Sequence, residues 1–216
     1  MTLTRTSFPR IDSHIGKRRL RLVICLGLYG GALGASSLLV SFMARTRYPI
    51  EPEHLQFVPS VILSGGGWIA GAIIAGLIGY WIAPTSVRPH NIILWLFIGF
   101  AFGVLLPFFS GALMPLGTVY LDLALGIIRL SDLPMLTLDA LMRAPISAFS
   151  QGVLGLFTGL IAGTMFGVGA WVMDIANTSS HPHASRYVPY VLSFSFSAVA
   201  VAIAAFGPAD ALAKLG

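Results

Sequence analysis

The sequence predicts an all-helical integral membrane protein, a glycine-rich, close-packed bundle of about five transmembrane helices. Three observations carry this prediction. Of the 216 residues, 56% are hydrophobic and only 10% are charged, whereas soluble domains carry about 25% charged residues. Several apolar runs are long enough to cross a hydrocarbon core of roughly 30 Å. Within these runs, glycines recur at four-residue steps, which places them near one face of a helix.

Residues 1–19 are predicted to form a polar, basic tail, and the first span is expected at residues 20–43. The basic stretch before this apolar run also resembles a signal peptide, with a small-residue cleavage site at 32–34. Because the run is long enough to span a membrane, we expect a retained anchor. Small residues share one face of this helix, and its predicted packing positions are Gly27, Gly31 and Gly34.

The second span is expected at residues 58–82, after a polar loop at 44–57. Three consecutive glycines at 65–67 each cost roughly 1 kcal/mol of helix stability relative to alanine. We therefore expect the helix to be irregular there, with a neighbour satisfying its backbone. Small residues continue along this helix at four-residue steps, and its predicted packing positions are Gly67 and Gly71.

The third span is expected at residues 92–114, with a kink at Pro107, because proline removes one helical hydrogen bond. The next segment, residues 115–146, is apolar but carries charges, and its charge-free stretches, such as 123–128, are too short to span a bilayer. The charged residues of this segment are Asp122, Arg129, Asp132, Asp139 and Arg143. We expect either two short helices lying in the membrane interface or a re-entrant hairpin.

The fourth span, expected as one helix at residues 147–173, organises the predicted bundle. It is uncharged, and four glycines recur at four-residue steps: Gly155, Gly159, Gly163 and Gly167. Each lies about 40° around the helix from the last. In lipid, a smooth glycine face lets another backbone approach closely, so these glycines are predicted helix-packing contacts. Because this spacing is common in membrane helices, it indicates packing and identifies no particular family.

A polar loop is expected at residues 174–187 and the fifth span at 188–206. One transmembrane domain then covers residues 20–207, and a short tail covers 208–216. Five spans place the termini on opposite sides of the membrane. The N-terminal side holds most of the basic residues, so the positive-inside rule places the N-terminus in the cytoplasm. We expect a bacterial-type inner membrane or a plasma membrane.

The chemistry expected within the spans is limited, because no Asp, Glu, Lys, Arg or His falls inside any of the five. Such residues usually mark proton relays and ion paths, so a proton pump and an intramembrane hydrolase are both disfavoured. All five histidines fall in the tail or in expected loops, which disfavours haem or chlorophyll held by histidine. The lone Cys25 excludes a cysteine metal site within one chain. We expect no enzyme activity, no metal and no cofactor; a pigment or lipid bound without histidine stays open.

The expected partners are the lipid bilayer, anionic lipid at the basic N-terminal tail, and either other membrane subunits or further copies of the chain. A basic flank beside a membrane helix is typical of a topology signal or an anionic-lipid contact. No nucleic-acid partner is expected.

Two functions fit these expectations. The first is a structural or accessory subunit that docks onto partner helices of a larger membrane complex, because the bundle has more small faces than five helices can satisfy. The second is a small-solute transporter, or a membrane subunit of one, that moves a neutral or amphiphilic solute. The pair formed by spans two and three weakly resembles the pair formed by spans four and five, and such a parallel repeat favours a transporter. Chance similarity explains this repeat better, however. The transporter's pathway would be lined by serines and by Gln151, Thr158 and Thr164. We favour the first function.

Overall fold

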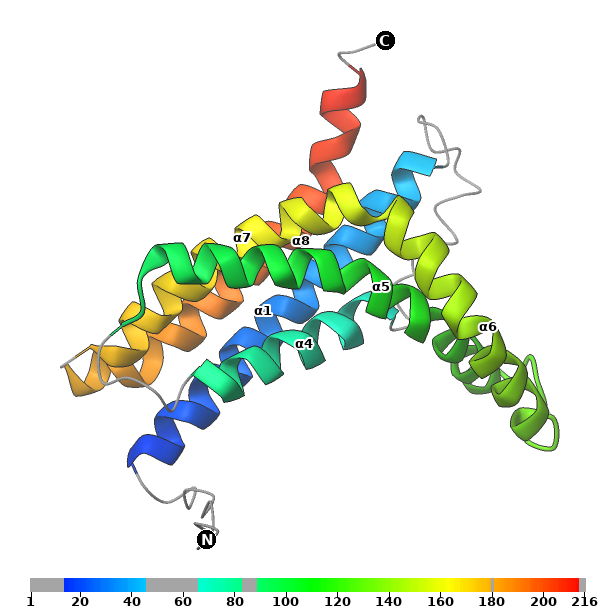
Figure 1. Cartoon of the computed structure of the whole chain (residues 1–216), viewed down its shortest axis with the longest axis horizontal. Helices are drawn as coiled ribbons and strands as arrows, with labels where there is room; N and C mark the ends of the chain where they lie inside the picture. Colours follow the sequence, from blue (N-terminus) through cyan, green and yellow to red (C-terminus); the bar gives the residue numbers. More distant parts are fainter. Residues whose placement is uncertain (1–13, 46–65, 83–88, 180, 214–216) are drawn as a thin grey trace, which may run out of the picture.

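The computed structural model describes residues 14–45, 66–82, 89–179 and 181–213, and within these residues the chain forms six helices and no strand. The helices are α1 (His14–Arg45), α4 (Gly66–Ile82), α5 (Ile92–Ala124), α6 (Leu133–Leu154), α7 (Leu156–Thr178) and α8 (Pro182–Ala213). The predicted all-helical architecture is confirmed for this part of the chain (Figure 1).

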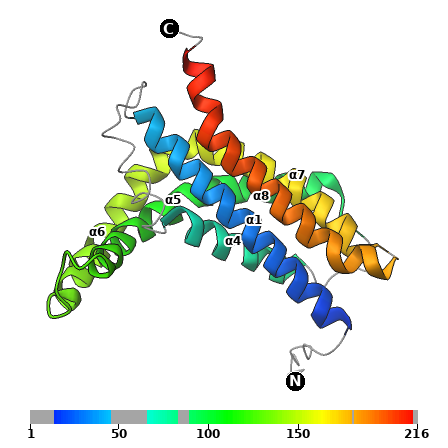
Figure 2. The same cartoon turned by 180° about the vertical axis from the view of Figure 1, so that it is seen from behind.

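Helices α1, α5 and α8 run in one direction through the bundle, and α4 and α7 run in the other (Figure 1). Helix α1 packs on α4, α7 and α8, while α5 packs on α4, α6 and α7. Seen from behind, α1 and α8 lie in front of α5 and α7 (Figure 2). One end of the bundle therefore combines the N-terminal ends of α1, α5 and α8 with the C-terminal ends of α4 and α7, and we call it the polar end.

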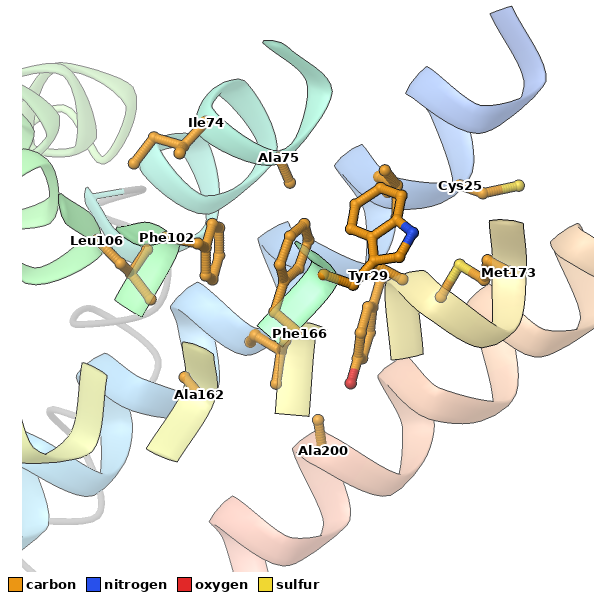
Figure 3. Packing of buried hydrophobic residues seen from close by; sticks show 14 of the residues in the cluster. Cys25, Tyr29, Ile74, Ala75, Phe102, Leu106, Ala162, Phe166, Met173 and Ala200 are labelled. Carbon is orange, nitrogen blue, oxygen red and sulfur yellow. The ribbon is translucent and has the colours of Figure 1, made fainter. Parts of the chain in front are cut away.

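Aromatic side chains from four helices form the centre of the core. Phe102 of α5 stacks on Phe166 of α7, with ring centroids 4.2 Å apart. The ring of Tyr29 in α1 contacts Phe166 (Figure 3) and also Phe196 of α8, at centroid distances of 6.1 and 5.8 Å. Because these rings interlock the helices by shape, they hold α1, α5, α7 and α8 in one packed unit.

Four helical segments are long and apolar enough to cross a membrane: Gly16–Ser41, Ile92–Ala124, Leu156–Thr178 and Ala184–Ala204. Helix α4 is also apolar but has 17 residues, fewer than the roughly 20 that a span needs. The expected second span began at residues 58–65, which lie outside the described residues. The chain therefore has the helices of a multi-pass membrane protein, and the count of five spans stays a prediction.

The segment expected to lie between spans three and four is largely helical. Helix α5 does not end at 114 but continues to Ala124, with Pro107 and Pro115 inside it. A turn follows, in which Gly126 adopts a φ of 72° that favours glycine, and α6 then returns along α5. Residues 115–154 thus form a helical hairpin, which we call the α5–α6 hairpin. Its depth in a membrane stays a prediction.

The expectation of one helix over residues 147–173 is wrong. Helix α6 ends at Leu154 and α7 begins at Leu156, so the chain changes direction at Gly155. Backbone hydrogen bonds of 2.8 Å continue through the bend, from Gly155 N to Gln151 O and from Gly159 N to Gly155 O. A Cβ added at Gly155 would lie 2.9 Å from the Cβ of Pro107. The bend therefore forms where Gly155 packs against Pro107 of α5.

The expected polar loop at residues 174–187 is also mostly helical. Helix α7 continues to Thr178, and α8 begins at Pro182, since proline is well suited to the first turn of a helix. Helix α8 then runs past the expected end of its span at 206 to Ala213. At the other terminus, α1 begins at His14 rather than at residue 20, which brings much of the predicted basic tail into a helix.

Candidate functional site

A buried carboxylate joins α7 to the start of α5 at the polar end of the bundle. Asp174 is only 3% exposed and lies one turn before the end of α7. Its Oδ2 accepts a hydrogen bond of 2.8 Å from the backbone N–H of His90 and one of 3.1 Å from Nε1 of the fully buried Trp95. The Nδ1 atom of His90 lies 3.0 Å from the same oxygen. A buried carboxylate needs such donors, because its desolvation is otherwise costly.

The start of α5 is positioned by this carboxylate together with a local cap. Asn91 is the N-cap of α5, and its side chain accepts a hydrogen bond of 3.3 Å from the backbone N–H of Ile93. Asp174 holds the preceding residue, His90, from the facing helix. The arrangement therefore fixes where α5 enters the bundle.

Asp174 corrects the expectation that no ionisable residue falls within a span. It lies inside Leu156–Thr178, one of the four segments long and apolar enough to cross a membrane. It is the first residue of the polar loop that was expected at residues 174–187. Its partners are Trp95 of α5 and His90 just before that helix, and their distance from residue 174 depends on tertiary packing.

Basic residues of the expected tail also pack against other helices at the polar end. Arg19 donates from Nε and Nη2 to the carbonyl oxygen of Tyr80, at 2.9 and 2.7 Å, and its guanidinium lies 3.6 Å from the centre of the Tyr80 ring. This cation satisfies a carbonyl in the last turn of α4, where the helix dipole favours positive charge. Asn177 of α7 donates to the carbonyl oxygen of Arg18 over 3.4 Å.

A second polar group lies between α1 and α7, away from the polar end. The hydroxyls of Ser41 and Thr158 are 2.6 Å apart, and Ser37 donates to Thr158 over 3.2 Å. These hydroxyls lie between two cavities. One, of about 20 Å³, is lined by Ser110 and Gln151 among others. The other, of about 80 Å³, is mostly apolar and is lined by residues of α1, α7 and α8.

The structure brings together two of the three residues expected to line a solute pathway. Gln151 and Thr158 both lie near the serines of α1. Thr164 lies apart, exposed on α7, and its hydroxyl donates to the carbonyl oxygen of Leu160 over 3.0 Å. Its place in the expected pathway is wrong, because a step of six residues from Thr158 turns the helix by about 600° and so to another face.

The glycines predicted on α7 all face α5. Gly159 lies against Gly103 and Gly163 against Gly99, so that a Cβ added at either would meet the backbone of α5. A Cβ at Gly167 would lie 2.7 Å from the carbonyl oxygen of Trp95. Sequence reasoning missed the partner glycines of α5, although Gly99 and Gly103 also stand four residues apart. The phenylalanines around them concealed that spacing.

The predicted glycines of α1 and α4 face each other in a similar way. Gly34 lies against Gly67, and Gly71 lies against Gly30, which shares the small face of α1. At Gly31 an added Cβ would lie 3.2 Å from the carbonyl oxygen of Trp68. Gly27 is less constrained, because its Cβ would make an ordinary contact of 3.6 Å with Ala72.

Within the part of the chain that the structure describes, no group of three or more His, Cys, Asp or Glu residues is placed to hold a metal ion. Comparison with the models of known protein families, with curated proteins and with solved structures finds no match. The geometry of the helices and of the polar groups between them therefore carries the evidence for function.

Proposed function

We propose that this chain is a non-catalytic accessory subunit of a larger membrane complex, which docks onto partner helices through the outer face of α6. The supporting observation is an apolar ridge on that face. Its members follow one another at intervals of three or four residues and are all exposed: Met135, Leu138, Met142, Ile146, Phe149 and Val153. This spacing places them along one side of a helix.

The opposite face of α6 is small and already occupied. Ala140 is buried there, and Gly152, on another side of the helix, is also buried, with the ring of Phe108 filling the position that a Cβ at Gly152 would take. Helix α6 packs almost entirely on α5 and extends away from the bundle (Figures 1 and 2). Its large side chains are therefore free to contact another protein.

The charges beside the ridge favour a partner helix over full immersion in acyl chains. Asp139 and Arg143 form an exposed ion pair of 2.9 Å on the flank of α6. A charge near the bilayer centre costs about 2.5–3.5 kcal/mol on insertion scales. Helix α6 is also not among the segments apolar enough to cross a membrane. A partner helix can cover the ridge and leave this charged flank near water.

The docking surface proposed here differs from the one that the sequence suggested. The sequence predicted docking through surplus glycine faces. Because Gly159 and Gly163 lie against α5, and Gly34 and Gly71 lie between α1 and α4, these faces meet one another within the chain. We therefore propose the apolar ridge on α6, rather than the glycine faces, as the docking surface for a partner.

The experiment compares two exposed phenylalanines. Phe149 on the ridge is 69% exposed and Phe97 on α5 is 72% exposed, so neither truncation to alanine opens a core cavity. After purification from native membranes in mild detergent, Phe149→Ala should lower the amount of a stoichiometric co-purifying membrane protein about tenfold or more, as expected for an interface hot spot. Phe97→Ala should leave that amount unchanged.

Two other outcomes are informative. Loss of self-association in Phe149→Ala alone would identify the partner as a second copy of the chain. A chain that purifies alone and monomeric, with both variants behaving alike, would contradict the docking role.

Transport of a small neutral solute is the second candidate function, and the hydroxyl group of Ser37, Ser41 and Thr158 favours it. These hydroxyls lie between the two small cavities. The hydroxyl of Ser110, beside the smaller cavity, is buried without a hydrogen-bond partner among the described residues. Together they form an uncharged polar path that could hydrogen-bond a neutral solute.

Solute flux into proteoliposomes tests this candidate. With glycerol as the neutral probe, Thr158→Val should change the flux severalfold, because it removes the hydroxyl that both serines contact. Thr164→Val is the matched control, since Thr164 is exposed elsewhere on α7. Flux no greater than that of protein-free liposomes, for a range of neutral solutes, would count against transport.

A further inference from the structure

An open, cationic cavity lies at the polar end between the first turns of α1 and α8. Its volume is about 450 Å³, and its lining residues are Lys17, Leu20, Arg21, Arg186, Tyr187 and Tyr190. The volume falls within the roughly 300–1,000 Å³ typical of small-molecule sites. Half of these side chains are cations and none is a carboxylate, so the cavity is suited to an anion.

The cations of this cavity have no carboxylate partner among the described residues. The ion pairs there join His90 to Asp174 and Arg143 to Asp139. Lys17, Arg21 and Arg186 take part in neither. The Nη1 atom of Arg21 is buried and has no hydrogen-bond partner within the described part of the chain. A buried donor left unpaired costs free energy, and an anion in the cavity would supply the missing acceptor.

The side chains of the cavity are arranged to hold an oxyanion. Lys17 and Arg21 are four residues apart on α1 and so share one helical face. The guanidinium of Arg186 lies 5.3 Å from the centre of the Tyr187 ring, a cation–π contact. Tyr190 completes the rim. Both helices begin at this end, so the positive ends of their dipoles also favour an anion.

The position of the cavity along the helices matches the depth of lipid headgroups. The apolar segments that can cross a membrane begin at Gly16 in α1 and at Ala184 in α8. The three cations lie within the first turn or two after these points, where Lys and Arg side chains reach the membrane surface. Tyrosine is also enriched at this depth.

We propose that this cavity is a binding site for a phosphate group, supplied by the headgroup of an anionic lipid or by a soluble phosphate compound. The planar fork of a guanidinium matches two phosphate oxygens, and an ammonium adds a point charge. The site includes Lys17 of the predicted basic tail, where an anionic-lipid contact was expected, and adds Arg21 and Arg186. It is independent of the accessory-subunit role, because it lies at the polar end and the ridge lies on α6.

The experiment counts bound lipids on the full-length protein by native mass spectrometry. Phosphatidylglycerol is the anionic probe, and phosphatidylcholine is the probe with the same phosphate but no net charge. The wild type should retain phosphatidylglycerol in preference to phosphatidylcholine. Arg21→Gln and Arg186→Gln should each weaken this binding about tenfold, as expected for loss of a charge-assisted hydrogen bond. Arg129→Gln, an exposed cation in the turn of the α5–α6 hairpin, should leave it unchanged.

A calorimetric titration with inorganic phosphate distinguishes the two sources. Suppose that inorganic phosphate binds, that Arg186→Gln weakens this binding, and that the protein shows no preference for phosphatidylglycerol. This combination assigns the site to a soluble phosphate compound. If Arg21→Gln fails to fold, as judged by its helical circular dichroism, the exposed variants Lys17→Gln and Arg186→Gln decide the matter. The proposal is overturned if neither probe binds, or if the variants at the cavity bind both probes as tightly as Arg129→Gln does.

Discussion

At the scale of single residues, the buried carboxylate of Asp174 in α7 is bonded to residues at and just before the start of α5. Its carboxylate accepts hydrogen bonds from the His90 backbone, just before α5, and from the indole of Trp95 in the first turn of α5. No other described carboxylate is buried. Removal of this side chain therefore affects two helices at once.

We expect Asp174→Ala to lower the free energy of unfolding by at least about 1–3 kcal/mol, because it leaves buried donors without an acceptor. Asp174→Asn keeps one oxygen acceptor and should cost less. Asp139→Ala is the control, since its exposed ion pair with Arg143 is worth about 1 kcal/mol or less. Denaturant unfolding of the purified protein in detergent measures all three. Equal losses for Asp174→Ala and Asp139→Ala would show that the buried carboxylate does not stabilise the bundle.

At the scale of helices, α5 and α7 approach each other closely through glycine. Gly163 has the backbone of Gly99 and Gly103 directly opposite. Backbone cannot move aside as the end of a flexible side chain can. A larger residue there must push the two helices apart.

We expect Gly163→Leu to destabilise the isolated chain by about 1–3 kcal/mol or more, the usual cost of overpacking. Ile161→Leu is the matched control, because Ile161 is half exposed on another side of α7. Thermal unfolding in mild detergent compares the two. An unchanged stability for Gly163→Leu would mean that the glycine face is not a close-packed contact.

The depth of the α5–α6 hairpin is a second prediction at this scale. We expect its charged residues to lie in water or among headgroups, because each would cost about 2.5–3.5 kcal/mol at the bilayer centre. Spin labels at positions 122, 132 and 139, read by their accessibility to oxygen and to a polar relaxation agent, test this. Midplane depth for all three would make the hairpin a transmembrane element.

At the scale of the whole molecule, the order of the helices determines on which side each terminus lies. Helix α1 begins and α8 ends at opposite ends of the bundle (Figure 1). Four described cations of α1, together with Arg186 of α8, gather at the polar end. The positive-inside rule assigns such an end to the cytoplasm.

We therefore expect cysteines introduced at Thr4 and Leu215, both outside the described residues, to react from opposite sides of the membrane. The cysteine at position 4 should react with a membrane-impermeant reagent only after the membrane is permeabilised, so that the reagent reaches the cytoplasmic side. The native Cys25 is buried and should stay silent. Reaction of both positions from one side would require an even number of crossings.

The sequence by itself determined the class of this protein. Low charge and long apolar runs require a lipid environment, and in lipid only helices and closed barrels satisfy every backbone group. Local patterns were also sufficient to locate Pro107 within a helix and to identify the glycines of α7 as a small face. Each of these conclusions depends on residues close together in the chain.

Only the tertiary structure decided where the helices end and what their faces meet. The bend at Gly155 forms beside Pro107 of α5. Asp174, near the end of α7, is buried because the backbone N–H of His90 and the indole of Trp95 donate hydrogen bonds to it. The cationic cavity requires Arg21 and Arg186 to lie together, although 165 positions separate them in the chain. No local pattern contains this information, because burial and hydrogen bonding depend on which helices pack together.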